Sequence, residues 1–476
     1  FQILLAKALE ADQAQRILGT PVAVRDFNAS FRVCSAIHAA GTKFVMLAMA
    51  DSSDYMLYAL EQKGLLYGSH QFLGSEAVTI LSHGSYQPSR GYPLGFMKFQ
   101  PPRGKLASLF EQMWMLMTPA DVYGEDARQR YGLDHLLVDL DAGSAPMLGA
   151  EDFKDLSRFP ALAMASLFDS LYLYALAFNR LLIQGRSPED VGGAGLWEVL
   201  RGVTFEGATG LIELDDNGDR VCPYHLWNAV PDVASLDNGT ILQDLGALHD
   251  DQVHLQINPR WAPAGEQRRF PPEELLECPA GFERDSTTNI CSRCTPGIGC
   301  GYRPEDGIPI GIASPITSIS SEFLGTSVAV WLDFQKNFDP DLRARLGPPV
   351  IEIPDLHRDL RIKFQIGTSH SSVGIGMNTA LDWLQGTGDF SRVAGMVFGF
   401  HSYIATPVAS ISAALKTPMV GFGAVSATLS DKAQFPYFLR TNSQDAVLGE
   451  ALWAWVETFS IPSAAFIYAQ DAAGLS

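Results

Sequence analysis

The sequence predicts an α/β protein whose parallel β-sheets are covered by helices on both faces. Helix-like and strand-like segments alternate along two long parts of the 476-residue chain. The strand-like segments are continuous apolar runs, as expected for strands buried on both faces and not on one. Between the two parts, residues 247–307 replace the periodic apolar pattern with prolines and clustered cysteines, which predicts a linker or a small separate module.

The first part, residues 1–246, begins with three helix–strand pairs. Apolar residues recur every three or four positions in the first ten residues, which is the period of an amphipathic helix. By the same patterns, helices are expected at 1–15, 30–40 and 52–63, and strands at 21–27, 43–48 and 71–74.

Two further signals stand out before residue 246. The most apolar stretch, residues 160–183, contains Asp169, Asn179 and Arg180, so it predicts a buried helix, clearest over 168–182, and not a membrane span. The pair Asn217-Gly218 predicts a β-hairpin between 210–214 and 220–224. The acidic turn around this pair lacks the spaced ligands and terminal glutamate of a calcium loop, so the hairpin is preferred.

From residue 308 the alternation resumes. Strands are expected at 308–313, 360–367, 393–398, 419–422 and 464–469, and helices at 320–338, 374–384, 404–415 and 444–458. The final strand leads into a turn and a helix start, whereas residue 1 lies in a helix already under way. Joined tail to head, residues 471 to 9 form one strand-turn-helix unit, with residue 1 next to residue 476 of the same or an adjacent copy. This predicts a tandem repeat, a polymer or a circular permutation.

The charge of the chain excludes one class of partner. Lysine and arginine total 34 against 53 aspartate and glutamate, a net charge of -19. Such a field repels phosphate backbones and anionic lipid, so no nucleic-acid partner is expected. At 47% hydrophobic residues, the chain has ample apolar surface for large cores, and no segment predicts a membrane span.

Four of the six cysteines cluster in a stretch rich in glycine, proline and threonine: Cys278, Cys291, Cys294 and Cys300. The stretch has no histidine and a single close Cys-x2-Cys pair, so disulfides are favoured over zinc. Short loops favour Cys278 with Cys291 and Cys294 with Cys300, although other pairings among the four stay open. The sequence does not indicate the partners of Cys34 and Cys222.

Two glycosylation sequons and the expected disulfides favour an extracellular location. The sequons begin at Asn28 and Asn238, and each would accept a glycan in a secreted protein. Disulfides persist in oxidising compartments. The sequence therefore predicts a secreted glycoprotein.

Several motifs resemble the type 1 periplasmic-binding, or Venus flytrap, fold of class C receptor and natriuretic-peptide-type receptor ectodomains. The first lobe of that fold is resembled by Val397-Phe398-Gly399-Phe400-His401-Ser402, Thr417-Pro418-Met419-Val420-Gly421-Phe422, Leu429-Ser430-Asp431-Lys432 and Phe435-Pro436-Tyr437-Phe438-Leu439-Arg440-Thr441. Its second half is resembled by residues 72–76, 168–172, 205–210 and 216–219.

The resemblance implies lobes in swapped order. Residues 308–476 look like the first lobe, completed by residues 1 onward of the same or the next copy, and residues 1–246 look like the second part of a flytrap. Residues 247–307 are similar to the Pro-rich linker and cysteine-rich module that follow the flytrap in those receptors.

The resemblance also implies candidate ligand-binding residues. Amino-acid-sensing relatives hold their ligand with hydroxyls after two first-lobe strands and an aromatic residue at the entrance to the second lobe. His401, Ser402 and Tyr403 keep polar groups at the first loop that could serve, and Glu76 could bind an ammonium group, although it could equally cap a helix. The chain departs from the pattern at residues 423–425, which read Gly-Ala-Val, and at 472–474, which read Ala-Ala-Gly. The missing anchors favour Ser402, Tyr403 and Glu76 as solvated cleft residues.

The leading functional hypothesis is a secreted structural protein whose flytrap-like domains repeat as an extracellular array or filament, with copies of itself as partners. The alternative is a ligand-binding ectodomain of a class C-like or cyclase-linked receptor that senses an amino acid or small anion. A permuted transport-binding protein is less favoured, because such proteins rarely carry a cysteine module. No nucleophile elbow, phosphate loop or His-Glu-x2-His motif is present, so no enzyme, cofactor or metal is expected.

Overall fold

The computed structural model divides the chain into two compact units. Unit 1 comprises residues 1–102, 223–294 and 445–476, and unit 2 comprises residues 103–222 and 295–444. The structure describes residues 43–48, 53–66, 70–74, 92–100, 104–124, 148–154, 162–188, 191–221, 224–231, 240–249, 252–260, 307–314, 320–358, 360–369, 372–386, 392–461 and 464–468, and the shorter pieces 33–34, 37, 102, 283–284, 291–292 and 390.

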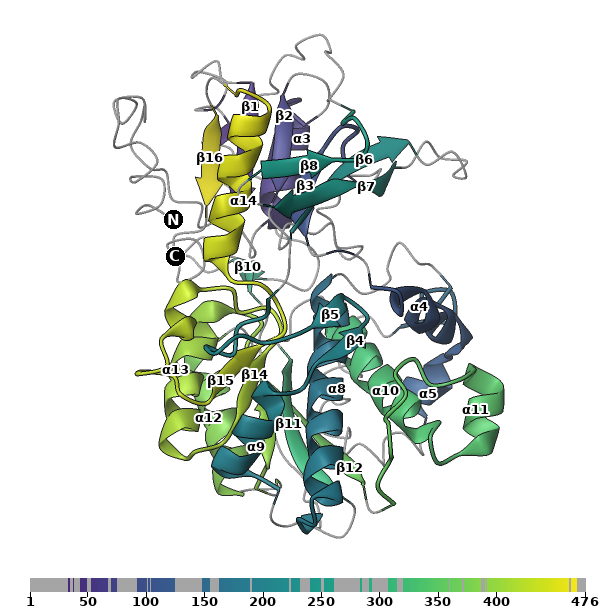
Figure 1. Cartoon of the computed structure of the whole chain (residues 1–476). Coiled ribbons are helices and arrows are strands. Elements are labelled where there is room, and N and C mark those ends of the chain that lie inside the picture. Colours follow the sequence, from purple (N-terminus) through teal and green to yellow (C-terminus); the bar gives the residue numbers. More distant parts are fainter. Residues whose placement is uncertain are drawn as a thin grey trace. The chain divides into compact units, whose positions relative to one another are not determined.

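Unit 2 is built on a five-stranded parallel sheet (Figure 1). The strand order is β12-β11-β13-β14-β15. All four neighbouring pairs are parallel, and Ile310 of β11, for example, lies opposite both Phe364 of β12 and Gly395 of β13. The strand bounds are β11 Ile308–Ser314, β12 Ile362–Thr368, β13 Gly395–Val397, β14 Met419–Gly421 and β15 Phe438–Arg440.

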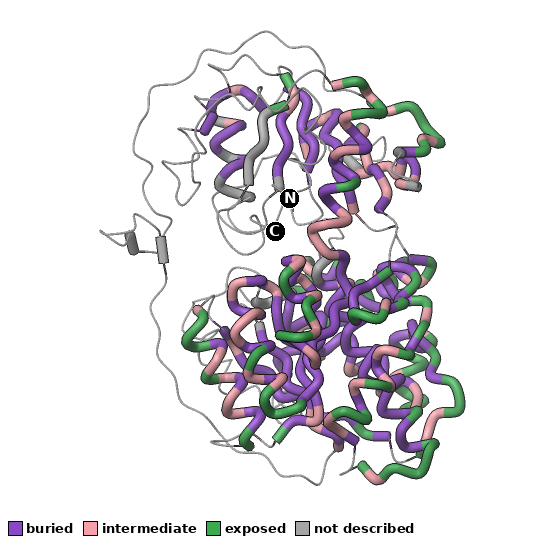
Figure 2. The backbone as a smooth tube through the Cα atoms, turned by 60° about the vertical axis from the view of Figure 1, so that its left-hand side comes forward, coloured by how far each residue is buried: buried purple, intermediate pink, exposed green. Residues whose placement is uncertain are grey.

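The two faces of this sheet are buried in two different hydrophobic cores. Helices α12 (Val373–Gln385) and α13 (Ser402–Ala414) cover one face, and α8 (Leu162–Ile183) and α10 (Ser320–Gln335) cover the other (Figure 1). Residues facing α12 and α13 alternate along the strands with residues facing α8 and α10, as the two-residue period of a strand requires: Met396 with Val397, Met419 with Val420, and Phe438 with Leu439. Figure 2 shows how far each part of the chain is buried, and all three short strands are buried throughout.

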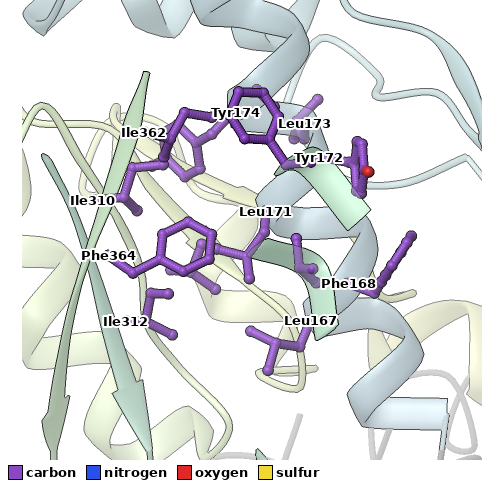
Figure 3. Packing of buried hydrophobic residues seen from close by; sticks show 14 of the residues in the cluster. Leu167, Phe168, Leu171, Tyr172, Leu173, Tyr174, Ile310, Ile312, Ile362 and Phe364 are labelled. Atoms are coloured by element: carbon purple, nitrogen blue, oxygen red, sulfur yellow. The ribbon is translucent and has the colours of Figure 1, made fainter. Parts of the chain in front are cut away.

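The long helix α8 forms the centre of the larger core, as the sequence predicted for a buried helix at 168–182. Its side chains pack on Ile310 and Ile312 of β11 and on Ile362 and Phe364 of β12 (Figure 3). The Tyr174 hydroxyl donates to the carbonyl of Pro418 at 2.8 Å and accepts from the Met396 N–H at 3.0 Å. One phenol thus bridges two neighbouring strands while its ring fills the core.

Shorter elements complete unit 2. The helices are α4 (Ala107–Leu116), α5 (Pro119–Tyr123), α9 (Gly193–Arg201) and α11 (Pro340–Leu346). The hairpin predicted for 210–224 differs in detail. Strand β5 (Gly210–Ile212) pairs with the preceding β4 (Phe205–Gly207), and the acidic turn closes through a single antiparallel bridge between Leu214 and Arg220.

Unit 1 contains a seven-stranded sheet in the order β16-β1-β2-β3-β6-β7-β8. Strands β16, β1, β2 and β3 are parallel, and β6, β7 and β8 are antiparallel. The strand bounds are β1 Phe44–Ala48, β2 Gln71–Gly74, β3 Met97–Gln100, β6 His225–Pro231, β7 Thr240–His249, β8 Gln252–Leu255 and β16 Ala465–Tyr468. Strands β7 and β8 therefore extend the sheet into the start of the predicted linker, where Leu248 packs in the same core in which Val253 is buried.

Helices cover both faces of this sheet as well. Helix α3 (Ser53–Gln62) packs on the face that carries Val45 and Leu47, and α14 (Asp445–Thr458) packs on the face that carries Met46 and Leu73. Strand β16 lies in register beside β1, so segments from opposite ends of the sequence share one sheet. Within the described residues, every helix is too short or too polar to cross a membrane.

Several predicted features fall outside the described residues. These are the helix at 1–15, the strand at 21–27, the junction of residues 471–476 with 1–9, and the glycosylation sequons at Asn28 and Asn238. In the cysteine segment, two short strands, β9 (Glu283–Arg284) and β10 (Cys291–Ser292), pair antiparallel, and the predicted disulfides lie outside what is described. Cys34 is a buried free thiol whose pKa is raised to about 12 by burial.

Candidate functional site

In unit 2, the chain leaves neighbouring strands toward opposite faces of the sheet at its carboxyl edge. From β11 the chain crosses to β12 through α10 on one face, and from β12 it crosses to β13 through α12 on the other. The loops that follow β11 and β13 therefore lead away from each other. In open α/β sheets, ligands bind at such a topological switch point, and the order 2-1-3-4-5 is one of its common forms.

A hollow lies at this switch point. It is lined by Ala313 near the end of β11, by Ser369 after β12, and by residues after β13: Phe398, Gly399, Phe400, His401 and Ile404. Its volume is about 10 Å³, which is room for about one water molecule. The hollow on unit 2 alone therefore accepts a small polar group and not a whole ligand.

His401 and Ser369 supply the polar side chains at the hollow. His401 is the N-cap of α13, and its ring stacks on Tyr403, with centroids 5.4 Å apart and planes 17° apart. Ser369 lies between the end of β12 and the start of α12, and both residues are buried. Two helix N-termini thus adjoin the hollow, and the partial positive charge of helix N-termini favours an anionic group.

The predicted binding residues Ser402 and Tyr403 lie in different surroundings. Ser402 is buried, and its hydroxyl accepts a hydrogen bond of 3.1 Å from the Ser426 N–H. That hydroxyl therefore fastens the loop after β14 to α13. Tyr403 is half-buried beside His401. Glu76 lies outside the described residues.

The second loop, residues 423–425, has no hydroxyl, as the sequence indicated. Gly423 follows β14, and a Cβ built on it would lie 3.0 Å from the Phe400 carbonyl oxygen. Ala424 and Val425 are buried. This loop consequently packs against the loop after β13 and contributes no polar side chain.

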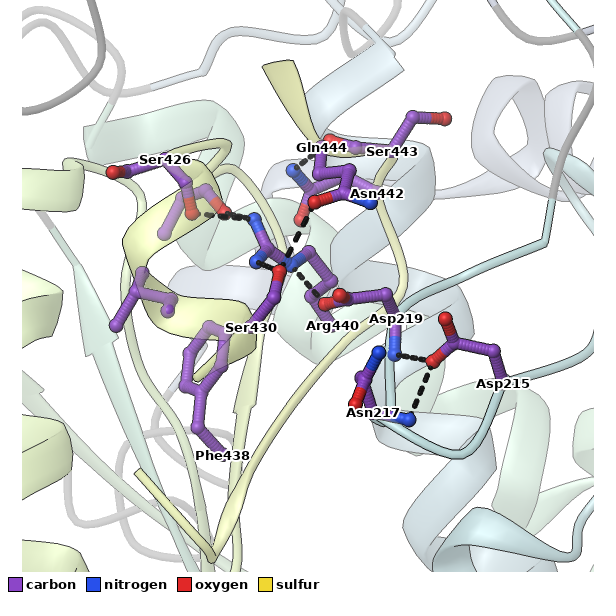
Figure 4. Close-up of polar contacts among 12 residues, drawn as sticks. Asp215, Asn217, Asp219, Ser426, Ser430, Phe438, Arg440, Asn442, Ser443 and Gln444 are labelled. Carbon is purple, nitrogen blue, oxygen red and sulfur yellow. Dashed lines mark hydrogen bonds and ion pairs between the residues drawn. The ribbon is translucent and has the colours of Figure 1, made fainter. Parts of the chain in front are cut away.

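A buried arginine organises the neighbouring loops (Figure 4). Arg440, at the end of β15, has no exposed surface. Its Nε donates to Asp219 Oδ1 at 2.6 Å, its Nη1 to the carbonyls of Ala424 and Ser426, both at 3.1 Å, and its Nη2 to Ser430 Oγ at 2.8 Å. The guanidinium of Arg440 and four acceptors on two loops therefore form one network, which we call the Arg440 cluster.

The acidic turn is shaped around Asp215. Its Oδ1 accepts from the N–H groups of Asn217 at 2.8 Å and Asp219 at 2.9 Å, which is the turn-forming role of aspartate that the sequence favoured. The carbonyl of Gly218 then accepts from the Arg440 N–H at 3.0 Å. Within the described residues, no three His, Cys, Asp or Glu side chains gather in a way that could hold a metal ion.

Lys432 adjoins the Arg440 cluster. Its ammonium group donates to the Phe438 carbonyl at 2.7 Å and lies 5.5 Å from the centre of the Phe438 ring. Burial lowers the pKa of this amine to about 8, although the Asp219 carboxylate opposes the shift, and Arg440 adds to it.

Sequence reasoning missed Ser369, Asp219 and Arg440. A signal was present for Arg440, because it directly follows the apolar pair Phe438-Leu439, and a charge next to buried residues needs partners. No comparable signal marks Ser369, since its place at the hollow depends on which strands become neighbours.

The fold and the hollow define a class of protein: an open α/β domain with its candidate binding position at a strand switch point. A family model described as the receptor family ligand binding region matches residues 40–232 and 350–476, more than half of the chain. The chain belongs to this family. The predicted resemblance to the type 1 periplasmic-binding fold is thereby confirmed for these two segments.

Loss of the Arg440 guanidinium should strongly destabilise unit 2. In Arg440→Met, the Asp219 carboxylate stays buried without its cation, which costs about 3–5 kcal/mol of unfolding free energy. The double variant Arg440→Met with Asp219→Asn should lose less than the two single variants added together. Urea unfolding measures all three.

The matched control is Arg201→Met. Arg201 forms its ion pairs with Glu198 and Asp216 at the surface, so its loss should cost less than about 1 kcal/mol. Equal losses for Arg440→Met and Arg201→Met would contradict the assigned role of the buried cluster.

Lys432 should make stability depend on alkaline pH. Its folded pKa lies below the unfolded value of 10.5, so the unfolded chain binds more protons between about pH 8 and 10.5. Stability should therefore rise with pH across this window in the native chain relative to Lys432→Met. Urea unfolding at a series of pH values measures the difference. The exposed Lys154→Met serves as control, and a Lys432→Met profile parallel to the native one would show that this lysine does not carry the effect.

Proposed function

We propose that the chain is a ligand-binding module of an extracellular receptor type, and that it recognises an amino acid or another small anion. The observation that carries this proposal is the hollow at the switch point of the unit 2 sheet, where His401, stacked on Tyr403, and Ser369 lie near two helix N-termini. Membership of a family described as a ligand-binding region supports the same function.

The chemistry of the hollow suggests which ligand group it would receive. A carboxylate oxygen fits a space of about one water molecule, and it would gain hydrogen bonds from helix N–H groups and from hydroxyl or imidazole donors. We place Ser369 and His401 in contact with that group. Ser402, whose hydroxyl accepts from the Ser426 N–H, acts instead by holding the second loop in place.

A second proposal is that flytrap-like domains of this kind assemble as a secreted array or filament. The observation in its favour is that polar side chains near the carboxyl edge already bind one another: Ser402 of α13 accepts from the Ser426 N–H, and Arg440 of β15 donates to four acceptors. This proposal includes the swapped lobe order, the disulfide module and the glycans that the sequence predicts.

Ligand binding should raise thermal stability. A ligand at about 100 times its dissociation constant adds about 2.7 kcal/mol, which shifts a melting transition visibly. Differential scanning fluorimetry with glutamate, glycine, other amino acids and small carboxylates should therefore reveal at least one compound that raises the melting temperature. Ser369→Ala should abolish the shift, whereas Ser410→Ala, on the exposed side of α13, should keep it. A panel without any shift would exclude the ligand-binding proposal for these compounds.

Assembly should be visible directly. If the array proposal holds, negative-stain electron microscopy of the native material should show fibres or lattices with a regular repeat. Single particles at all concentrations would contradict it, and a ligand-induced thermal shift in the same material would then favour the receptor-type module.

A further inference from the structure

The chain passes between the two units four times, after residues 102, 222, 294 and 444. Three of these passages adjoin residues of unit 2 that the structure describes, namely Gly104, residues 219–221 and residues 440–444. These segments are far apart in the sequence. Within unit 2, however, the first two are attached to the same short turn, which joins β4 to β5 at residues 207–210 and which we call the β4–β5 turn, and the third is joined to the second.

The first segment touches the β4–β5 turn through its backbone. The Gly104 N–H donates to the Ala208 carbonyl at 3.2 Å. A Cβ at position 104 would lie 2.4 Å from both the Gly207 oxygen and the Gly210 nitrogen, closer than real contacts allow. Glycine at 104 is therefore required by the approach of two backbones.

The second and third segments meet through one guanidinium. Arg220 Nη1 donates to Thr209 Oγ1 at 2.7 Å and to the Thr441 carbonyl at 3.0 Å. Its Nη2 donates to the carbonyls of Thr209 at 2.8 Å and Leu211 at 3.0 Å. Arg220 is buried, so its charge depends on these acceptors, and it binds the β4–β5 turn and the third segment at once.

The third segment is also attached to helix α8. The hydroxyls of Thr441 and Ser170 are 2.7 Å apart, and Thr441 Oγ1 donates to the Ser166 carbonyl at 3.1 Å. In addition, the Arg440 side chain binds Asp219 of the second segment. The second and third segments are therefore joined at two successive positions.

Asp169 of α8 holds the turn to which the first two segments attach directly and the third through Arg220. Its carboxylate accepts from the N–H groups of Ala208 at 2.7 Å and Thr209 at 2.9 Å, and from Thr209 Oγ1 at 2.5 Å. A Cβ on Gly207 would lie 2.5 Å from the same carboxylate, so the turn closes directly over it. Burial raises the pKa of Asp169 to about 6, and the Thr209 hydroxyl and the Arg220 charge oppose that shift, so the group is ionised at pH 7.5.

We propose that Asp169, Thr209 and Arg220 form a hinge anchor, which fixes the unit 2 ends of three connecting segments to one point. Because the segments share this point, loss of the anchor should loosen their unit 2 ends together. The proposal holds whether or not the chain binds a ligand.

Hydrogen–deuterium exchange of the full chain at pH 7.5 tests the anchor. In Asp169→Asn, amides in residues 104–107, 208–211, 220–221 and 441–444 should exchange about tenfold faster, while amides in the unit 2 sheet keep their rates. Thr209→Val, which loses the hydroxyl that Asp169 and Arg220 share, should give the same pattern, and Thr209→Ser should restore native rates. If Asp169→Asn fails to fold, the comparison of Thr209→Val with Thr209→Ser still tests the proposal.

The matched control is Asp333→Asn. Asp333 is an equally buried aspartate of unit 2 that accepts from the N–H groups of Val350 and Ile351 and from the Tyr172 hydroxyl, and it pairs with Lys336 at 2.7 Å, but none of these partners belongs to a connecting segment. Its variant should speed exchange around Lys336 and at residues 348–353, and it should leave the three connecting segments unchanged. The anchor would be refuted by a uniform increase across unit 2 in Asp169→Asn, or by an increase confined to 208–211.

Discussion

The parallel sheet of unit 2 is buried on both faces, and this constraint governs where the chain can place its chemistry. Strands such as β13 present Met396 to one core and Val397 to the other, so neither face is left for a ligand. Polar groups therefore gather at the carboxyl edge, where strands end and helices begin. The hollow with His401 and Ser369 and the cluster around Arg440 both lie in loops that follow strands of this sheet.

The buried cations of unit 2 offset the cost of desolvation in the same way. Arg440 and Arg220 each combine side-chain acceptors with backbone carbonyls, and Lys336 does the same, with Asp333 at 2.7 Å and the Pro348 carbonyl at 2.8 Å. A buried cation without such partners would cost several kcal/mol. Because the carbonyls belong to irregular loops, each cation determines the path of a loop as well as satisfying its own charge.

Local pattern predicted the elements well where a segment is strongly apolar or strongly periodic. Strand β2 matches its expected bounds, strands β11 and β16 and helices α3 and α12 lie within one residue of theirs, and α8 begins six residues earlier than expected. Strand β15 and helix α9 were missed, because three residues are too few to show a period and because α9 has glycine at two of its first three positions.

The candidate site was harder to predict than the elements. Ser402 was identified by resemblance, but its bond to Ser426 depends on a contact between two loops that sequence spacing does not encode. The hinge anchor depends on Arg220 reaching Thr441, two residues separated by 221 positions in the sequence. The role of a turn residue such as Asp215 was simpler to predict, since these partners lie within four positions of it.

The pairing of β1 with β16 has a consequence for how the chain is made. Strand β1 leaves the ribosome roughly 400 residues before its neighbour, which at about 5–20 residues per second is a delay of roughly 20–80 s. During that time, the backbone groups of Phe44–Ala48 on that side have no strand to bind, and an open strand edge is a template for pairing with other chains. Synthesis in the cell therefore favours a chaperone, or an early temporary cover, over this edge until Ala465–Tyr468 arrives.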